Sequence, residues 1–224
     1  MYKLFAKQLY KISNIKNSIR IIVGESFNKL GLLLDLYSKT NSYYIPFSKN
    51  IYDNDNFTIS TKYKYLTYQY LKPFRSIILK LIPYNIMIAT DIIYIYDLIN
   101  SGKGILSFVH IYNIMFPEFK KKIRLILITD TINSKYKLYY SSNNSIKIKK
   151  KLNKDKIKFK IINFKCNMYI LSIFTQEIYN NRCFKSLSID QICSKKFDGN
   201  IFEIYDKINL NNLIKFYIID RNQC

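Results

Sequence analysis

Four short runs of β-branched and aromatic residues recur in the first part of the chain. Each run is nearly continuous in apolar side chains and is followed by a glycine or a polar residue. Uninterrupted apolar runs of this length are typical of strands buried on both faces, as in a parallel sheet. The expected strands cover residues 19–23, 43–47, 92–96 and 123–128.

Between these runs, apolar residues recur every third or fourth position, which predicts amphipathic helices. Pro73 should kink the helix expected at 63–81, and Pro117 should end the one expected at 98–116. Further helices are expected at 3–12, 26–37 and 168–179; residues 3–12 would also suit a basic transit peptide, but we favour a helix of the mature chain. The buried face expected for 63–81 comprises Leu66, Tyr70, Phe74, Ile77 and Leu81.

The alternation of strands and helices predicts a three-layer α/β domain in which a parallel sheet has helices on both faces. After residue 136 the pattern changes. Apolar residues at 157, 159 and 161 alternate with Lys158 and Lys160, which predicts a strand with one basic face. We therefore expect an α/β domain at 1–150 and a basic C-terminal extension of unassigned role at 151–224.

Charge narrows the choice of partner. The chain has 36 Lys plus Arg against 15 Asp plus Glu, a formal net charge of +21. A domain with that excess repels itself unless a polyanion neutralises it. Nucleic acid is the commonest such partner, and an anionic membrane surface is the second candidate.

Composition also points to the source of the gene. The chain has 40 Ile, 31 Lys, 23 Asn, 21 Tyr and 15 Phe, no Trp and only 5 Gly. AT-rich codons specify all five of the abundant residue types, so we interpret this as codon drift in an organellar genome. Part of the Lys excess is then mutational in origin.

The residues that enzymes need are sparse. His110 is the single histidine, so a Ser-His-Asp triad or a histidine metal cluster has too few members. Gly24 and the stretch 101–104 lack the glycine spacing of nucleotide-binding loops. We expect no enzyme activity, no cofactor, no small-molecule substrate and no metal site. The cysteines form no CxxC pair; they are Cys166, Cys183, Cys193 and Cys224.

No stretch is long and apolar enough to predict a membrane span. The most apolar one, 77–98, is interrupted by Lys80, Pro83 and Asp91.

A dense lysine segment is the main candidate for binding. Its ammonium groups would neutralise phosphates and release counterions, and neighbouring Tyr and Phe rings could stack on unpaired bases. The alternative is a solvated face produced by codon drift. The candidate RNA-binding residues are Lys147, Lys149, Lys150, Lys151, Lys154, Lys156, Lys158 and Lys160.

Four segments in order resemble motifs of the small ribosomal subunit protein two (S-two) family. Residues 19–25 (IRIIVGE) resemble its ILFVGT strand, and 43–59 resemble its PYVNxRWLGGxLTNFxTI stretch in length and in the closing NFTI. Residues 90–97 (TDIIYIYD) and 122–131 (KIRLILITDT) are similar to its PDAVFVVD and IPVIAIVDTN segments. Asn133, Tyr140 and 143–144 follow at nearly the family spacing. The Trp and paired Gly of the second motif are absent, and the family's helical hairpin shrinks to 63–83.

The resemblance covers residues 1 to about 150. It implies a flavodoxin-like domain without catalysis that binds small-subunit ribosomal RNA and neighbouring ribosomal proteins, in a mitochondrial or, alternatively, a plastid ribosome. Two other classes of protein stay open from the sequence. One is a peripheral basic subunit of an organellar membrane complex, and the other is a nucleotide-binding enzyme on a doubly wound fold.

Overall fold

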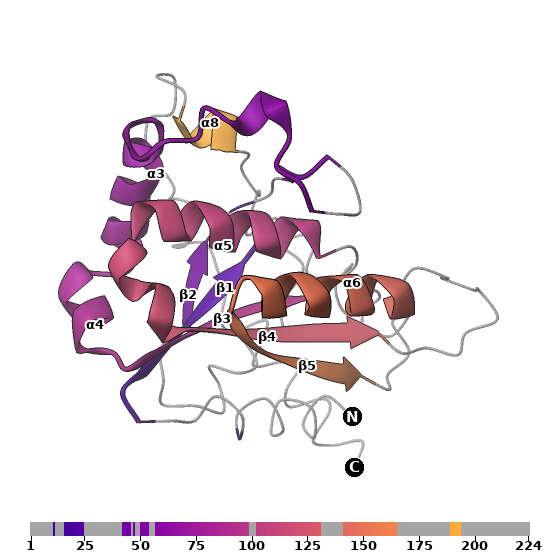
Figure 1. Ribbon diagram of the computed structural model, residues 1–224. Coiled ribbons are helices and arrows are strands. Elements are labelled where there is room, and N and C mark those ends of the chain that lie inside the picture. The colour runs from indigo at the N-terminus through magenta and orange to yellow at the C-terminus, as the bar shows by residue number, and fades with distance from the viewer. Residues whose placement is uncertain are drawn as a thin grey trace, which may run out of the picture.

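A five-stranded sheet forms the centre of the molecule. The computed structural model describes residues 11, 16–24, 42–45, 47, 50–53, 57–98, 102–130, 141–164 and 189–193. The strands are β1 (Ser18–Val23), β2 (Ser42–Ile45), β3 (Ile92–Leu98), β4 (Ile123–Asp130) and β5 (Lys158–Phe164). All pairs are parallel, in the order β2-β1-β3-β4-β5 (Figure 1). The expected parallel α/β architecture is confirmed, and its strand order is the flavodoxin-like one.

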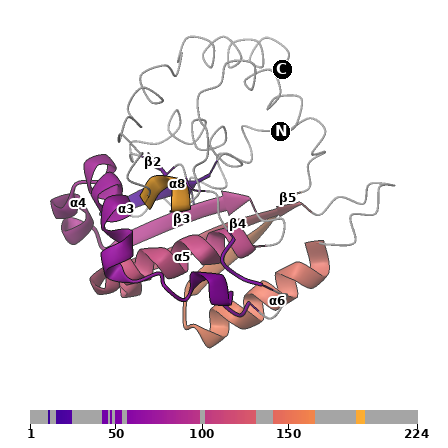
Figure 2. The same cartoon turned by 90° about the horizontal axis from the view of Figure 1, so that it is seen from above.

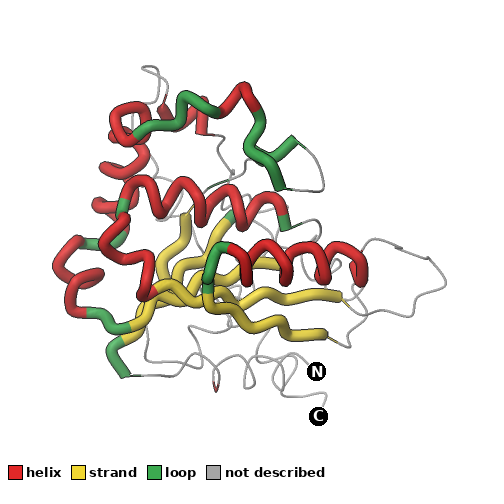
Figure 3. The backbone as a smooth tube through the Cα atoms, viewed as in Figure 1, coloured by secondary structure: helices red, strands yellow, loops and turns green. Residues whose placement is uncertain are grey.

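The helices that connect the strands lie on one face of this sheet, which we call the first face. The steps from β2 to β3, β3 to β4 and β4 to β5 all run in one direction across the sheet, so right-handed crossovers place their helices together. Figures 2 and 3 show this arrangement. These helices are α3 (Tyr68–Leu81), α4 (Tyr84–Ala89), α5 (Lys103–Met115) and α6 (Ser141–Lys154), with 3-10 turns at Thr61–Tyr63 and Pro117–Lys122. The short α8 (Ile189–Cys193) follows β5 in the chain and contacts α3.

The main core lies between the first face and these helices. Ile21, Ile95 and Leu125 are neighbours across three strands and have no exposed surface. Aromatic rings join the loop after β2 to the helices: Phe47 stacks on Phe74 of α3 at 5.8 Å and meets Phe108 of α5 at 5.5 Å. Because α5 is buried along most of its length, it packs as the central helix of this layer.

At β1, β2, β3 and β4 the opposite, second face of the sheet also carries buried side chains, as the continuous apolar strands predict. Ile22 and Tyr96 are fully buried, and Tyr44 and Tyr94 are nearly so. The helices expected at 3–12, 26–37 and 168–179 lie outside the described residues. The expected layer of helices on this second face is therefore not described either.

Two expected helix boundaries were wrong. The helix expected to begin at residue 63 begins after Thr67, whose side chain accepts a hydrogen bond from the Tyr70 N–H at 3.4 Å and so caps the first turn. Its fully buried residues include Leu71 and Ile78, whereas Tyr70 is only half-buried. The stripe that faces the core is thus rotated from the expected one.

Leu98 belongs to β3, where it pairs with Ile128, and not to the following helix. That helix, α5, begins after Gly102, whose φ of 73° is a left-handed conformation that glycine adopts at little cost.

The sheet extends further along the chain than expected. Residue 150 lies inside α6, and β5 pairs in parallel with β4 from Lys158 to Phe164. The boundary placed at residue 150 therefore moves beyond Phe164, and much of the lysine segment belongs to the α/β domain.

Candidate nucleic-acid interface

Helix α6 is anchored by two apolar side chains. Ile148 and Leu152 stand four residues apart, so they share one face of the helix. Both are fully buried, and α6 contacts β4 and β5. Four lysines beside these anchors are exposed: Lys147, Lys149, Lys150 and Lys154.

A compact turn links α6 to β5. The Lys156 N–H donates to the Asn153 carbonyl at 3.1 Å, and the Ile157 N–H donates to the Leu152 carbonyl at 3.0 Å. These two bonds form the Schellman motif that commonly ends a helix. Lys156 has a φ of 55° at the position where glycine is usual. The turn therefore connects the lysines of α6 directly to those of β5.

Strand β5 has the predicted basic face. Lys158 and Lys160 are exposed on the second face of the sheet, while Phe159 and Ile161 are half-buried against the main core. Lys158 lies beside Arg124 of β4 in the strand register. Like charges on neighbouring strands destabilise each other, so a bound polyanion would relieve a repulsion built into this edge of the sheet.

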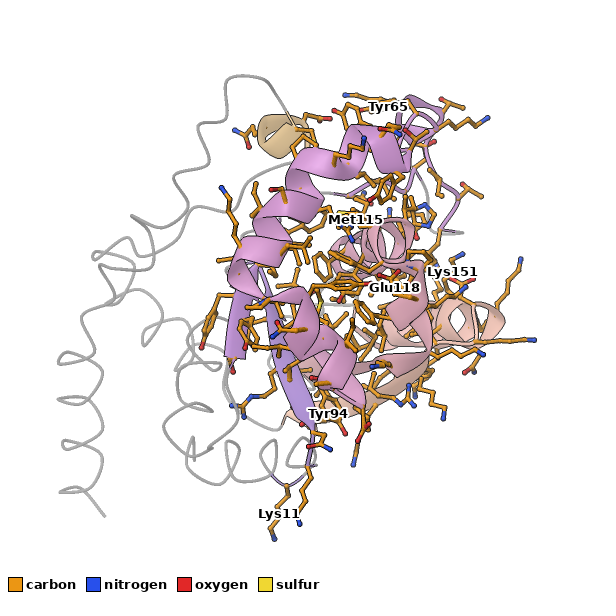
Figure 4. The ribbon with its side chains drawn as sticks, turned by 90° about the vertical axis from the view of Figure 1, so that its left-hand side faces the viewer. Lys11, Tyr65, Tyr94, Met115, Glu118 and Lys151 are labelled. Atoms are coloured by element: carbon orange, nitrogen blue, oxygen red, sulfur yellow. The ribbon has the colours of Figure 1, made fainter. Side chains whose placement is uncertain are left out.

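Lys151 differs from its neighbours. Its ammonium group lies 3.2 Å from both carboxylate oxygens of Asp155, and the two side chains are 22% and 33% exposed. Seven of the eight candidate lysines are thus exposed, and Lys151 is half-buried in an ion pair (labelled in Figure 4). The structure brings all eight onto one helix, one turn and one strand.

Lys122 shows that not every lysine of the chain is available to a partner. Its ammonium group donates to the carbonyls of Met87, Ile88 and Thr90 at 3.2, 2.7 and 2.6 Å. These carbonyls lie at the end of α4, where a cation satisfies groups that the helix leaves unbonded. Lys122 therefore has a structural role.

His110 and the cysteines are the groups considered for other chemistry. Burial, with a smaller contribution from the charge of Lys151, lowers the pKa of His110. Burial raises the pKa of Cys193 to about 11, which favours the thiol over the metal-binding thiolate. Among the described residues, no group of three or more His, Cys, Asp or Glu gathers as metal ligands would. Cys166, Cys183 and Cys224 lie outside the described residues.

The glycine-containing segments considered for a nucleotide lie at two strand ends. Gly24 follows β1 with a φ of 69°, and Gly102 precedes α5. The first turn of α5 is tied to the 50–52 segment, because the Ser107 hydroxyl accepts from the Ile51 N–H at 3.0 Å and donates to the Lys103 carbonyl at 2.6 Å. This bridge fixes the loop after β2 against the helix.

The fold and this surface together define a basic α/β protein with a parallel sheet. No family model matches the chain, and no curated protein matches it either. Among solved structures, it is similar to Clostridium botulinum phage c-st TubZ, with 13% identity and a TM-score of 0.40 over 81% of this chain. The matched part spans 61% of the TubZ chain. A similarity of that degree carries no inference about function.

In the described part of the chain, no helix combines the length and apolar character that a membrane crossing requires.

Proposed function

We propose that the protein is a structural, RNA-binding component of the small subunit of an organellar ribosome, most simply a mitochondrial one. The observation that carries this proposal is the lysine surface of α6, the turn and β5, which covers both sides of one edge of the sheet. Its seven exposed lysines lie on a helix, a turn and a strand, and the helix and strand pack their apolar side chains against the core. Such a surface binds phosphates at fixed positions without reading base sequence.

The sequence resemblance to the S-two family adds the ribosomal part of the proposal. The flavodoxin-like strand order agrees with what that resemblance implies. Neighbouring small-subunit proteins are the proposed protein partners, and catalysis has no part in the role. A plastid ribosome is the alternative location.

Sedimentation tests the ribosomal role. An organelle lysate is separated on a sucrose gradient with and without ribonuclease, and the chain is followed by mass spectrometry. Co-migration with the small subunit that ribonuclease abolishes is the expected result. Migration with a membrane complex, unaffected by ribonuclease, would refute the proposal and favour a peripheral membrane role.

A paired substitution tests the lysine surface itself. The double variant Lys150→Gln/Lys154→Gln removes two charges from α6, and Lys120→Gln/Lys121→Gln removes two exposed charges from the turn before β4. RNA binding is measured over a range of salt concentrations. The slope of log affinity against log salt should fall by roughly 1.5 in the first variant, because each neutralised phosphate contributes about 0.7–0.9, and should stay unchanged in the second.

A further inference from the structure

A second surface lies on the outer side of α3. It is a shallow, open groove along one stripe of the helix, away from the side that packs on the core. Figures 1 and 2 place α3 and α4 at the opposite end of the molecule from α6. The groove is lined by Tyr68, Lys72, Arg75, Ser76, Leu79 and Lys80.

Two exposed aromatic rings flank this groove. Tyr68 is 42% exposed and Tyr84, at the start of α4, is 40% exposed. Exposed large rings stand out here because most aromatic side chains of the described residues are buried or half-buried. Tyr68 therefore has a face or edge available to a planar partner, whereas the ring of Tyr84 also meets that of Phe119 at 5.5 Å.

Arg75 holds the two rings in place. Its guanidinium carbon lies 5.8 Å from the centroid of the Tyr68 ring, 5.9 Å from that of Tyr84 and 5.0 Å from that of Phe116. Its Nε donates to the Met115 carbonyl at the end of α5, at 3.2 Å. The guanidinium is thus fixed from below, and the rings beside it are ordered before any ligand arrives.

Tyr84 has a second restraint. Its hydroxyl donates to a carboxylate oxygen of Glu118 at 3.0 Å, and this hydrogen bond raises the pKa of Tyr84. This bond ties the ring hydroxyl to the turn before β4. Figure 4 shows Glu118 and Met115 lying beside α3.

The charge of the segment selects the kind of partner. Between residues 56 and 90 the sequence contains no Asp or Glu. Glu118, bonded to Tyr84, is the acid that faces the rings. The cations of the segment are Lys62, Lys64, Lys72, Arg75 and Lys80. Ordered rings set among cations are the combination that binds single-stranded nucleic acid, in which bases stack on aromatic faces and phosphates meet ammonium groups.

We propose that the α3 groove binds an unpaired stretch of RNA, with a base stacked on Tyr68 and phosphates held by Lys72 and Lys80. The proposal rests on the proposed function for the identity of the ligand as RNA. It adds a second contact of a different kind. The α6 surface binds phosphates of any strand, whereas the groove requires bases whose faces are free, so it discriminates against duplex RNA.

A tryptophan reporter tests the stacking directly. The chain has no Trp, so the full-length Tyr68→Trp variant carries a single one, in the groove. Addition of an unstructured oligouridine should quench its emission, and a duplex of equal length should not. The control is Tyr65→Trp. Tyr65 is also 42% exposed, but its hydroxyl bonds to Asp190 of α8 at 3.0 Å and its ring packs on Tyr70; we expect no quenching there.

Substitutions test the contribution to affinity. Tyr68→Leu removes the ring and keeps an apolar side chain, so oligouridine binding should weaken about tenfold with an unchanged salt slope. Tyr68→Phe keeps the ring and should bind as the unmodified chain does. Lys150→Gln/Lys154→Gln, in contrast, should lower the slope. The two surfaces are thus distinguished by different measurements.

Three outcomes would overturn the inference. If the reporter is not quenched while the α6 variant still lowers the salt slope, the groove proposal fails and the proposed function stands. If no variant binds RNA and neither does the unmodified chain, both proposals fail. If Tyr68→Leu binds RNA normally but no longer sediments with the ribosomal particle, the groove binds a protein and not RNA.

Discussion

Removing the anchor of α6 is the sharpest test of how the lysine surface is supported. Leu152 is fully buried, so Leu152→Ala should lower the free energy of unfolding by about 2–5 kcal/mol, the lost transfer free energy plus the cavity left behind. The ion pair of Lys151 with Asp155 is partly exposed and contributes no more than about 1 kcal/mol. It therefore cannot hold α6 in place when the packing of Leu152 is lost. The free energy of unfolding of a typical domain is about 5–15 kcal/mol, so Leu152→Ala should remove a large fraction of it.

Urea denaturation followed by circular dichroism measures the loss, and hydrogen exchange locates it. Exchange should accelerate most in α6, because the remaining apolar anchor, Ile148, must then hold the helix against β4 and β5 without Leu152. Asn153→Ala, at the exposed neighbouring position, is the control and should change stability by less than about 0.5 kcal/mol.

The RNA measurement adds a second readout. Leu152→Ala leaves every lysine in place, so RNA affinity should fall while the salt slope is retained. A loss below about 1 kcal/mol, or unchanged exchange in α6, would refute the packing described for this helix.

Three further predictions concern other parts of the structure. Burial lowers the pKa of His110, so as the pH falls the unfolded chain takes up a proton near pH 6.5, before the folded chain does. The free energy of unfolding should therefore decrease below about pH 6.5. In urea titrations His110→Asn should make this decrease smaller, and an unchanged pH profile would contradict the prediction. Lys156→Gly should raise the urea midpoint by the equivalent of roughly 0.5–1 kcal/mol, since glycine adopts the observed φ of 55° without strain; a lower midpoint would count against it. Arg75→Leu should lower the free energy of unfolding by about 1–3 kcal/mol, because it leaves the Met115 carbonyl without its side-chain donor and removes the contact with Phe116. A urea midpoint equal to that of the unmodified chain would argue against a stabilising role of Arg75.

The sheet could be predicted because its signal is local. Ile19–Val23 and Ile92–Tyr96 lie in strands buried on both faces, so nearly every residue had to be apolar. The basic face of β5 was also predicted, because the alternation of Lys158 and Lys160 with apolar residues has the period of a strand. In both cases the pattern of apolar residues within one short segment is enough to predict a strand.

Helix α6 could not be recognised so simply. Its described anchors, Ile148 and Leu152, are set among lysines, and a single i, i+4 pair gives a weak helical signal. The start of α3 was missed for another reason: Thr67 caps the helix without a Glu or Gln three residues later, so the familiar capping pattern is absent.

The α3 groove could not be predicted from the sequence. The chain has 21 Tyr, and nothing local separates the exposed Tyr68 from the buried Tyr63. Whether a tyrosine is exposed depends on which side of its helix packs against the rest of the fold. The cluster around Arg75 joins α3, α4 and the end of α5, and such contacts between distant segments appear only once the fold is known.

The position of β5 has a consequence for the behaviour of the chain during synthesis. It is the last strand in the described sheet order, and the free edge of a sheet can recruit the corresponding edge of another copy. Lys158 and Lys160 oppose such pairing, because two copies would bring four ammonium groups together. Under the proposed function, RNA would neutralise them only after the chain had entered its particle. The same lysines would thus act as a safeguard against aggregation in newly made chains that are waiting for assembly.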